Sequence, residues 1–293
     1  MAISQSKMSD LTNTKGKEVP VDVFHLDQIP DAMENMGWEM APKLMRHWFS
    51  ITPAFAFNEE SKENLLNLDA NLITPSKIND DIITMAWAMR FQQVFESIKN
   101  LKATWSSEAG LSVLKSRLKK LGYNERSNIS IGFSSDVKLL DSLAQVNFKV
   151  IGDKSDTIDD WYGAMGLSTL KICVRGHTEN MNGKSFIHVE SIGFYLKDTY
   201  DFLDEKIVGI SVLEPLGIWS KKRVLNKIET ASYMSSYVTS SFIDLSLYFS
   251  GFVPIFNSDF REWQKKHNSG GDFIVFSDVL WMPPLDKDRV IEL

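Results

Sequence analysis

The residues that decide the fold run from Leu167 to Leu196 and read LSTLKICVRGHTENMNGKSFIHVESIGFYL. Apolar and polar residues alternate from Leu167 to Arg175 and again from Phe186 to Leu196, which is typical of β-strands. Asn182-Gly183 lies between these two runs and is a dipeptide that strongly favours a tight hairpin turn. The sequence therefore predicts a long antiparallel hairpin.

Other strand-like runs flank this hairpin. Gln145 to Val150 alternates polar and apolar residues, which predicts a strand with one face in water. Ile207 to Leu213, Tyr237 to Phe249 and Phe273 to Trp281 are also rich in strand-forming residues. We therefore expect an antiparallel sheet after Tyr123.

Before Tyr123 the apolar period is helical. Helices are expected from Pro30 to Gly37 and from Trp38 to Phe49, and a third ends near Gly122 with one apolar face. The longest predicted helix follows Asn79, because one helical face carries a row of apolar residues: Ile83, Trp87, Phe91, Val94, Ile98, Leu101 and Trp105. The polar stretch 58–75 is expected to be a loose connection between two helical blocks.

Helices that precede strands, without alternating with them, indicate the α+β class. We predict an N-terminal helical block packed on a C-terminal, mainly antiparallel β-sheet. The expected organisation is a disordered tail over residues 1–20, a helical region over 21–123 and a sheet region over 124–293, the last two forming one continuous globular unit.

Composition excludes several classes of protein. The 293 residues are 43% hydrophobic and 24% charged, as in globular domains, and the net charge of −6 argues against nucleic acid as a partner. The single cysteine, Cys173, excludes an internal disulfide and a cysteine-rich zinc cluster. Residues 1–20 lack the apolar stretch of a secretory signal, and residues 241–256 are too short to span a bilayer, so no stable membrane insertion is expected.

The candidate catalytic residues are Asp198, Tyr200, Asp201 and His188, all in or just after the second half of the hairpin. Two carboxylates beside a phenol and an imidazole are suited to general acid–base catalysis or to binding a divalent cation. The structural alternative is that Asp198 and Asp201 accept backbone N–H groups in a turn at the end of the strand. The sequence leaves both interpretations open.

Two other motifs are weaker. Gly176 to Ser185 ends like a P-loop, but six residues separate its glycines where a phosphate-binding loop has four, so a hairpin turn is favoured. His188 and Glu190 have the H-x-E spacing of zinc deaminases, yet Cys173 alone cannot supply the cysteine pair that those enzymes use. A strand-face histidine bonded to a neighbour is the simpler interpretation.

Two further groups of residues have structural and functional interpretations. Arg261 and Trp263 are able to anchor a ligand, or Arg261 pairs with a nearby acid while Trp263 covers the core. The early helices are rich in soft or aromatic side chains that suit either a core or a partner groove: Met33, Met36, Met40, Met45, Trp38 and Trp48.

Several blocks resemble an uncharacterised bacterial family of unknown function that is frequently encoded beside the spike genes of type VI secretion. The blocks, in order, are IPDAMENMGWEMAPKLMRHWF, DDIITMAWAMRF, DDWYGAMGLSTLKICV, IGFYLKDTYDF, PLGIWS and FREWQKKHNSGGDFIVFSDV, within Val21 to Met282. The resemblance implies an antibacterial effector or effector-accessory protein that stays in the bacterial cytoplasm before export. Its implied partners are a secretion spike or a cognate immunity or toxin protein.

A second, local resemblance concerns Asp198-Thr199-Tyr200-Asp201, which is similar to the D-x-Y-D core of colicin M-type toxins. It implies a phosphoester hydrolase that acts on a cell-envelope precursor, with or without a divalent cation. The segment after the motif, Leu203 to Ile207, lacks the histidine and arginine of those toxins. A non-enzymatic adaptor or binding module is the third expectation.

Overall fold

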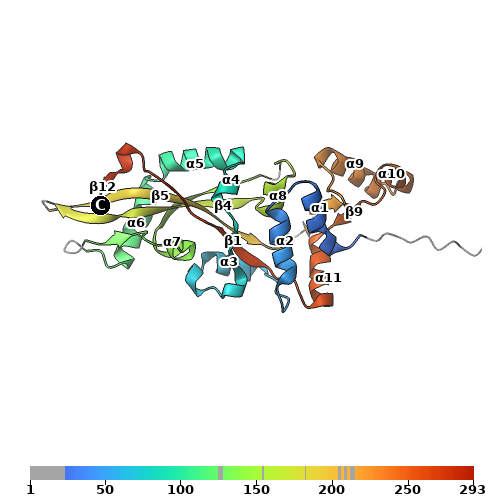
Figure 1. The fold of residues 1–293 in the computed structure, drawn as a ribbon, viewed down its shortest axis with the longest axis horizontal. Coiled ribbons are helices and arrows are strands. Elements are labelled where there is room, and N and C mark those ends of the chain that lie inside the picture. The colour runs from blue at the N-terminus through green and yellow to red at the C-terminus, as the bar shows by residue number, and fades with distance from the viewer. Residues whose placement is uncertain are drawn as a thin grey trace, which may run out of the picture.

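The computed structural model describes residues 24–124, 128–153, 155–181, 183–203, 206–207, 210–211 and 215–293. The predicted tail over residues 1–20 lies outside these ranges. The predicted hairpin is confirmed: strands β4 (Ser168–Met181) and β5 (Lys184–Tyr200) pair antiparallel from Thr169–Lys197 to Met181–Lys184. Figure 1 shows this hairpin extending along the long axis of the molecule.

Six other strands complete one sheet around this hairpin. They are β1 (Ile78–Ile83), β2 (Ser130–Ile131), β3 (Gln145–Ile151), β10 (Phe273–Ser277), β11 (Leu280–Met282) and β12 (Val290–Glu292). Strands β2 and β3 pair with β4, whereas β10, β11 and β12 pair with β5. All pairs are antiparallel except β1 with β10. The α+β class with a mainly antiparallel sheet is therefore confirmed.

Eleven α-helices are described, and most of them precede the hairpin. They are α1 (Ile29–Asn35), α2 (Ala41–Ser50), α3 (Glu59–Asn67), α4 (Met85–Ala88), α5 (Gln92–Thr104), α6 (Glu108–Lys120), α7 (Val137–Leu143), α8 (Asp160–Ala164), α9 (Lys227–Val238), α10 (Phe242–Tyr248) and α11 (Asn257–His267). In Figure 1, α4 and α5 lie along one side of the hairpin and α3 and α7 along the other. Short strands β6 (Lys206–Ile207) and β7 (Ile210–Ser211) pair with each other, as do β8 (Gly217–Trp219) and β9 (Val253–Ile255).

Aromatic side chains dominate the core that joins the helices to the sheet. Trp48 of α2 is fully buried and meets Phe202 and Phe260 edge to face, at centroid distances of 5.0 and 5.3 Å. Trp87 of α4 stacks on Trp161 of α8 at 5.7 Å. Met33, Met40 and Met45 are buried with Trp38 and Trp48, and Met36 is partly buried against the same cluster, so these side chains belong to the core.

The predicted long helix after Asn79 is wrong in its first half. Residues 78–83 form strand β1 at the edge of the sheet, α4 begins after Thr84, and α5 begins only at Gln92. The Thr84 hydroxyl accepts a hydrogen bond from the Trp87 N–H, which starts a new helix there. Parallel pairing with β10 thus outweighs the helical period, because Asn79 and Ile83 are buried against that strand.

Two other predicted segments are corrected. Residues 237–249 belong to helices α9 and α10, not to a strand, and an Asn226–Glu229 capping box starts α9. The stretch 58–75, expected to be a loose connection, contains helix α3, which Asn58 caps by accepting from the Ser61 N–H at 2.7 Å. In both segments a polar side chain caps the start of a helix that the spacing of apolar residues alone does not predict.

Strand β3 is present as predicted, but its apolar face is only partly covered. Val146 is buried, whereas Phe148 and Val150 are 59% and 53% exposed. A register shift between Gln145 and Asn147 interrupts the strand's alternation.

One buried carboxylate joins three parts of the fold. Asp160, the first residue of α8, accepts hydrogen bonds from the backbone N–H groups of Glu39, Met40 and Ala41 at 2.9–3.1 Å. It also accepts from Trp87 Nε1 at 2.9 Å. These backbone donors are the unsatisfied N–H groups at the start of α2, so Asp160 acts as the cap that α2 lacks in its own sequence.

Replacement of Asp160 is therefore expected to destabilise the whole protein. Asp160→Ala leaves four donors without an acceptor, three of them buried, and we expect the free energy of unfolding to fall by about 3 kcal/mol. Urea denaturation followed by tryptophan fluorescence measures the change. The control is Asp286→Ala, which removes an exposed ion pair with Arg289 and should cost less than about 0.5 kcal/mol. Equal losses in the two variants would contradict this role.

Candidate functional site

The predicted residue Asp201 is used structurally. Its Oδ2 lies 2.7 Å from Lys62 Nζ of α3, and its Oδ1 accepts a hydrogen bond from the Leu203 N–H at 3.1 Å. The Asp201 side chain is only 6% exposed. This is the turn that the structural alternative anticipates, with an ion pair added.

Asp198 and Tyr200 lie at the C-terminal end of β5, far from the hairpin turn, where the strand pairs with β10. Tyr200 is buried and stacks on Phe273 at 5.4 Å, and burial raises the pKa of its phenol. Asp198 is half-buried beside Val275, and burial raises the pKa of its carboxyl well above the ordinary value. The charge of Lys62 opposes this rise and that of Asp201 adds to it, so these two acids and one lysine form a local group.

His188 does not join this group. It lies ten residues before Asp198 on the same extended strand, which corresponds to about 33 Å at a rise of about 3.3 Å per residue. Asp198 and Asp201 at the end of β5 thus interact electrostatically, whereas Tyr200 stacks on Phe273 and His188 lies far along the strand. The geometry gives no support to a single acid–base site made of all four, and a catalytic role for them stays a prediction.

His188 belongs instead to a cross-strand group of two histidines and two glutamates. Its ring stacks on that of His177 at 5.1 Å, and its Nε2 lies 2.7 Å from Glu179 Oε2 in an ion-pair contact without hydrogen-bond geometry. His177 Nδ1 lies 3.2 Å from Glu190 Oε1. The H-x-E pair of His188 and Glu190 is therefore divided, each residue facing a partner on β4.

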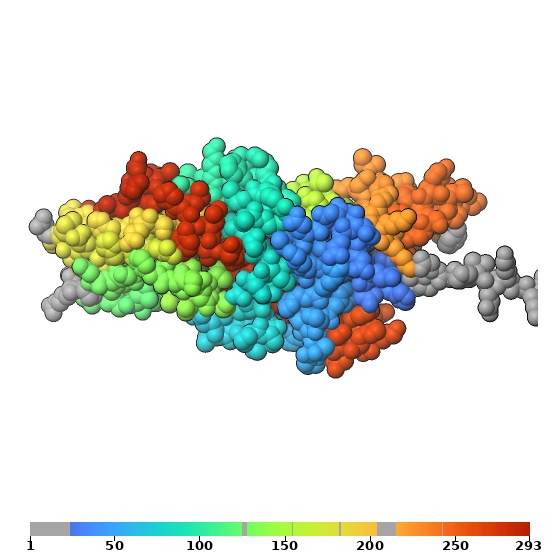
Figure 2. All heavy atoms as spheres, viewed as in Figure 1, coloured from blue at the N-terminus to red at the C-terminus, as the bar shows by residue number. Residues whose placement is uncertain are grey.

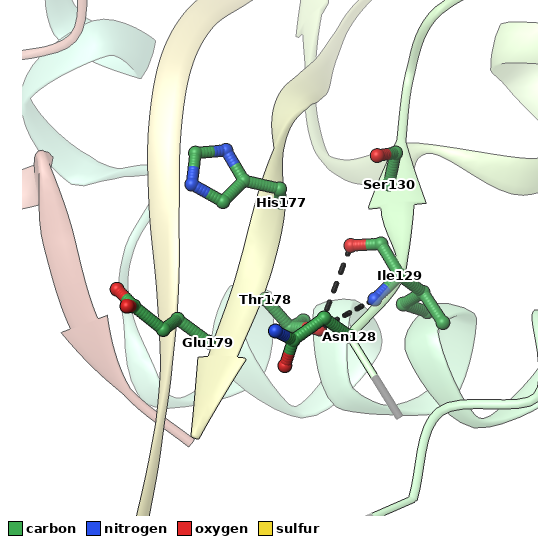
Figure 3. A pocket seen from close by; sticks show the side chains of 6 residues that line it. All are labelled: Asn128, Ile129, Ser130, His177, Thr178 and Glu179. Atoms are coloured by element: carbon green, nitrogen blue, oxygen red, sulfur yellow. Dashed lines mark hydrogen bonds between the residues drawn. The ribbon is translucent and has the colours of Figure 1, made fainter. Parts of the chain in front are cut away.

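A small pocket of about 230 Å³ lies beside this group (Figure 3). Its lining includes Ser130 and His177, which are register partners on β2 and β4. Figure 3 shows the His177 imidazole turned away from Ser130 and toward β5, so this histidine is not positioned to act as a base for the Ser130 hydroxyl. Among the residues that the structure describes, no cluster of His, Cys, Asp and Glu side chains is arranged to hold a metal ion.

A buried ionic cluster lies under α7 that the sequence analysis did not single out. Asp141 accepts from Lys171 Nζ at 2.6 Å, from Lys197 Nζ at 2.9 Å and from the Tyr195 hydroxyl at 2.7 Å. Burial opposes ionisation of Asp141, but the two ammonium groups outweigh it and hold its pKa below the ordinary value. Burial, with the charge of Lys197, lowers the pKa of Lys171. One carboxylate thus serves two buried cations.

A groove of about 810 Å³ lies between the start of the described chain and α11. One wall comes from Phe24 to Asp31, which lead into α1, and the other from Asp259 to His267 of α11. Figure 1 shows α1 and α11 next to each other at this place. We call this feature the α1–α11 groove.

Carboxylates and one aromatic pair characterise the α1–α11 groove. Asp31 pairs with Arg46 at 2.7 Å, and Asp259 accepts from the Phe256 N–H at 2.7 Å. Asp27 and Glu262 are exposed and make no hydrogen bond or ion pair with any described residue. The remaining groups are Lys266, which contributes one positive charge, and Trp263, whose ring stacks on His267 at 3.9 Å.

The structure distinguishes between the two interpretations of Arg261 and Trp263. Arg261 pairs with Asp272 in a two-pronged contact at 3.0 and 2.7 Å, as the structural alternative predicts. Asp272 is buried and also accepts from Trp48 Nε1 and the Phe57 N–H; burial nevertheless raises its pKa. Trp263 packs on the core and also faces the groove.

Sequence reasoning missed the α1–α11 groove because its two walls are more than two hundred residues apart in the chain. The available signal is the acidic content of both segments, DQIPD at 27–31 and DFRE at 259–262. Neither segment matches a known binding motif, so the sequence does not predict that the two segments lie side by side. Only the tertiary structure shows it.

Asp141→Asn is expected to destabilise the protein and to change its acid sensitivity. Loss of the carboxylate leaves two buried ammonium groups uncompensated, at a cost of about 3–5 kcal/mol at neutral pH. Because the native pKa of Asp141 is lowered, the native state binds fewer protons than the unfolded chain below about pH 4. The stability from ionised Asp141 is therefore present above that pH and is lost as pH falls.

Urea titrations at pH 7 and at pH 3 measure this difference. The variant should lose less stability between the two pH values than the parent protein does. Asp286→Asn, an exposed acid, is the control and should follow the parent. Parallel losses in the Asp141 variant and the parent would contradict the assignment.

The chain matches one family by sequence. The profile of a family of unknown function (DUF6402) matches residues 24–293, which is nearly the whole chain, and the protein belongs to this family. Neither a curated protein nor a solved structure gave a match. No helix in the described ranges has the length and apolar character needed to cross a membrane.

Proposed function

We propose that this DUF6402 protein is a non-enzymatic binding protein that serves bacterial type VI secretion as an effector-accessory or adaptor. The observation that carries the proposal is the α1–α11 groove, with its unpaired carboxylates. Pockets of about 300–1,000 Å³ are the usual size for specific ligands, and this groove falls in that range.

The chemistry of the groove favours a positively charged segment of a partner protein. Asp27 and Glu262 stand on opposite walls, and neither forms an ion pair with a residue in the described ranges. The Trp263–His267 pair offers an aromatic surface between them, on which a guanidinium or the stem of a lysine packs favourably. Lys266 is the one basic side chain in the lining that a cationic segment would have to avoid.

A binding role fits the described residues better than a hydrolytic one. Asp201 forms an ion pair with Lys62, and the buried ring of Tyr200 stacks on Phe273. His188 lies far from both along β5 and contacts Glu179 of β4. A colicin M-like or metal-assisted hydrolase requires these groups to converge on one substrate. The α1–α11 groove requires no such convergence, because its charges already face one open space.

The secretion context rests on the resemblance of the sequence blocks. We place the protein in the bacterial cytoplasm before export, with delivery by the type VI route. Its partner in this proposal is a spike protein or a cognate toxin or immunity protein. A gene for a separate toxin beside this gene would favour a loading role, and expression without harm in cytoplasm and periplasm would favour it further.

The proposed binding is tested by co-purification of the tagged full chain from its native host. Glu262→Lys combined with Asp27→Lys reverses the charge of both walls and should reduce recovery of the partner at least tenfold, because two favourable pairs become repulsive. Quantitative mass spectrometry of the eluted proteins measures the recovery.

Glu96→Lys combined with Glu108→Lys is the matched control, since it makes the same charge change on exposed residues of α5 and α6. The control should retain the partner. Equal recovery with both double variants would contradict a role for the groove. Toxicity that is lost in an Asp198→Asn, Asp201→Asn variant with a native unfolding curve would favour the hydrolase instead.

A further inference from the structure

A small lobe formed by residues 215–256 projects from one end of the molecule. It contains the β8–β9 pair and helices α9 and α10, which lie beyond the helices that cover the sheet (Figure 1). In Figure 2 the orange residues of this lobe form the tip of the elongated molecule on the side opposite the hairpin turn. The lobe has a core of its own made of only Ile218, Leu225 and Tyr233, with four partly buried neighbours.

The outer surface of the lobe is apolar. Large side chains on α9 and α10 are far more exposed than is usual for their kind: Ile228 (84%), Tyr237 (48%), Val238 (75%), Ile243 (72%), Leu247 (70%) and Tyr248 (74%). Helix α10 turns Leu245 inward to the small core, whereas Ile243, Leu247 and Tyr248 face outward. Asp244 is the one acid among them, and its carboxylate accepts a hydrogen bond from the Ser241 hydroxyl at 2.6 Å. Exposed apolar side chains gathered in this way normally mark a surface that packs against protein or lipid.

Charge is distributed unevenly over the lobe. From Thr230 to Phe256 the chain contains one charged residue, Asp244. The segment that leads into α9 is basic, with Lys221, Lys222, Arg223 and Lys227, and Glu229 is the other acid of the lobe. The lobe therefore has four basic and two acidic residues in a chain whose net charge is −6.

We propose that this lobe docks the protein on the surface of an anionic lipid bilayer. The exposed side chains at the C-terminal end of α9 and on α10 enter the interface between headgroups and acyl chains, where tyrosine is also favoured. The basic segment lies at the other end of α9, which spans about 18 Å for its twelve residues. With the tip inserted by about 5–10 Å, the basic end of α9 stays within about 8–13 Å of the bilayer surface, a distance comparable with a Debye length, so Lys222 beside this end is attracted to the anionic headgroups.

Two observations favour a bilayer over another protein. The apolar residues are on a projecting tip and line neither the α1–α11 groove nor the pocket beside His177, whereas protein partners usually meet an apolar groove or a flat patch. The positive charge of the lobe is opposite to that of the molecule and matches anionic headgroups. The described helices are too short to span a membrane, so the contact is peripheral.

Vesicle flotation with the full chain tests this proposal. Vesicles of phosphatidylglycerol and phosphatidylethanolamine should bind at least ten times more protein than vesicles of phosphatidylcholine. Ile243→Ser combined with Leu247→Ser should reduce binding at least tenfold, because it removes two of the inserted side chains. Lys222→Glu should reduce binding to the anionic vesicles alone.

The matched control is Leu72→Ser, which removes a leucine that is 71% exposed outside the lobe. This control should float like the parent, and because the flotation assay contains only protein and lipid, failure of lipid binding is separate from failure of the proposed partner binding. Absence of flotation, or equal flotation of the Ile243, Leu247 variant and the parent, would overturn the proposal. A dimer in light scattering that this variant abolishes, without flotation, would assign the surface to a second copy instead.

Discussion

The antiparallel pairing of β4 with β5 is the interaction on which the other parts of the structure depend. Strands β2 and β3 pair with β4, β10 to β12 pair with β5, and β1 reaches the sheet only through β10. The hairpin is also the surface on which both helical layers pack, with α5 contacting β4 and α3 and α4 contacting β5. Its length follows from local chemistry, since alternation on both sides of a turn-forming dipeptide extends the pairing over thirteen residue pairs, with one register shift between Arg175 and Gly176.

Buried carboxylates fix the helices against this frame. Asp160 caps α2, Asp141 neutralises two lysines that project from the hairpin, and Asp272 joins Arg261 of α11 to Trp48 of α2. Each carboxylate accepts at least three hydrogen bonds, which compensates for the cost of burying its charge. Acidic residues at strand ends and helix starts are therefore used here to join distant elements. Asp201 has the same kind of role, because Lys62 of α3 and a backbone N–H occupy both of its oxygens.

Because these buried carboxylates are used in structural contacts, the features suited to recognition lie elsewhere, at the end of the molecule away from the hairpin turn. The α1–α11 groove presents unpaired carboxylates, whereas the lobe of residues 215–256 presents apolar side chains beside basic ones. The two surfaces differ in sign and polarity, so they suit different partners and are able to act at the same time. In our proposals the groove holds a protein segment and the lobe holds a lipid surface, which would place a bound partner at an envelope.

The sequence alone determined the hairpin, its tight turn, the α+β class, the early helices and the helix that ends at Lys120, close to Gly122, because alternation, period, glycine and proline act over a few residues. It also indicated the Arg261 ion pair as one of two interpretations. It did not determine whether residues 78–83 are helix or strand, because parallel pairing with β10 lies almost two hundred residues away. Nor did it exclude a contact between His188 and Asp198. Only the structure shows that the strand between them is continuous and extended, which keeps the two side chains apart. The α1–α11 groove and the exposed face of α9 and α10 were decided by tertiary packing, which sets the neighbours of each side chain.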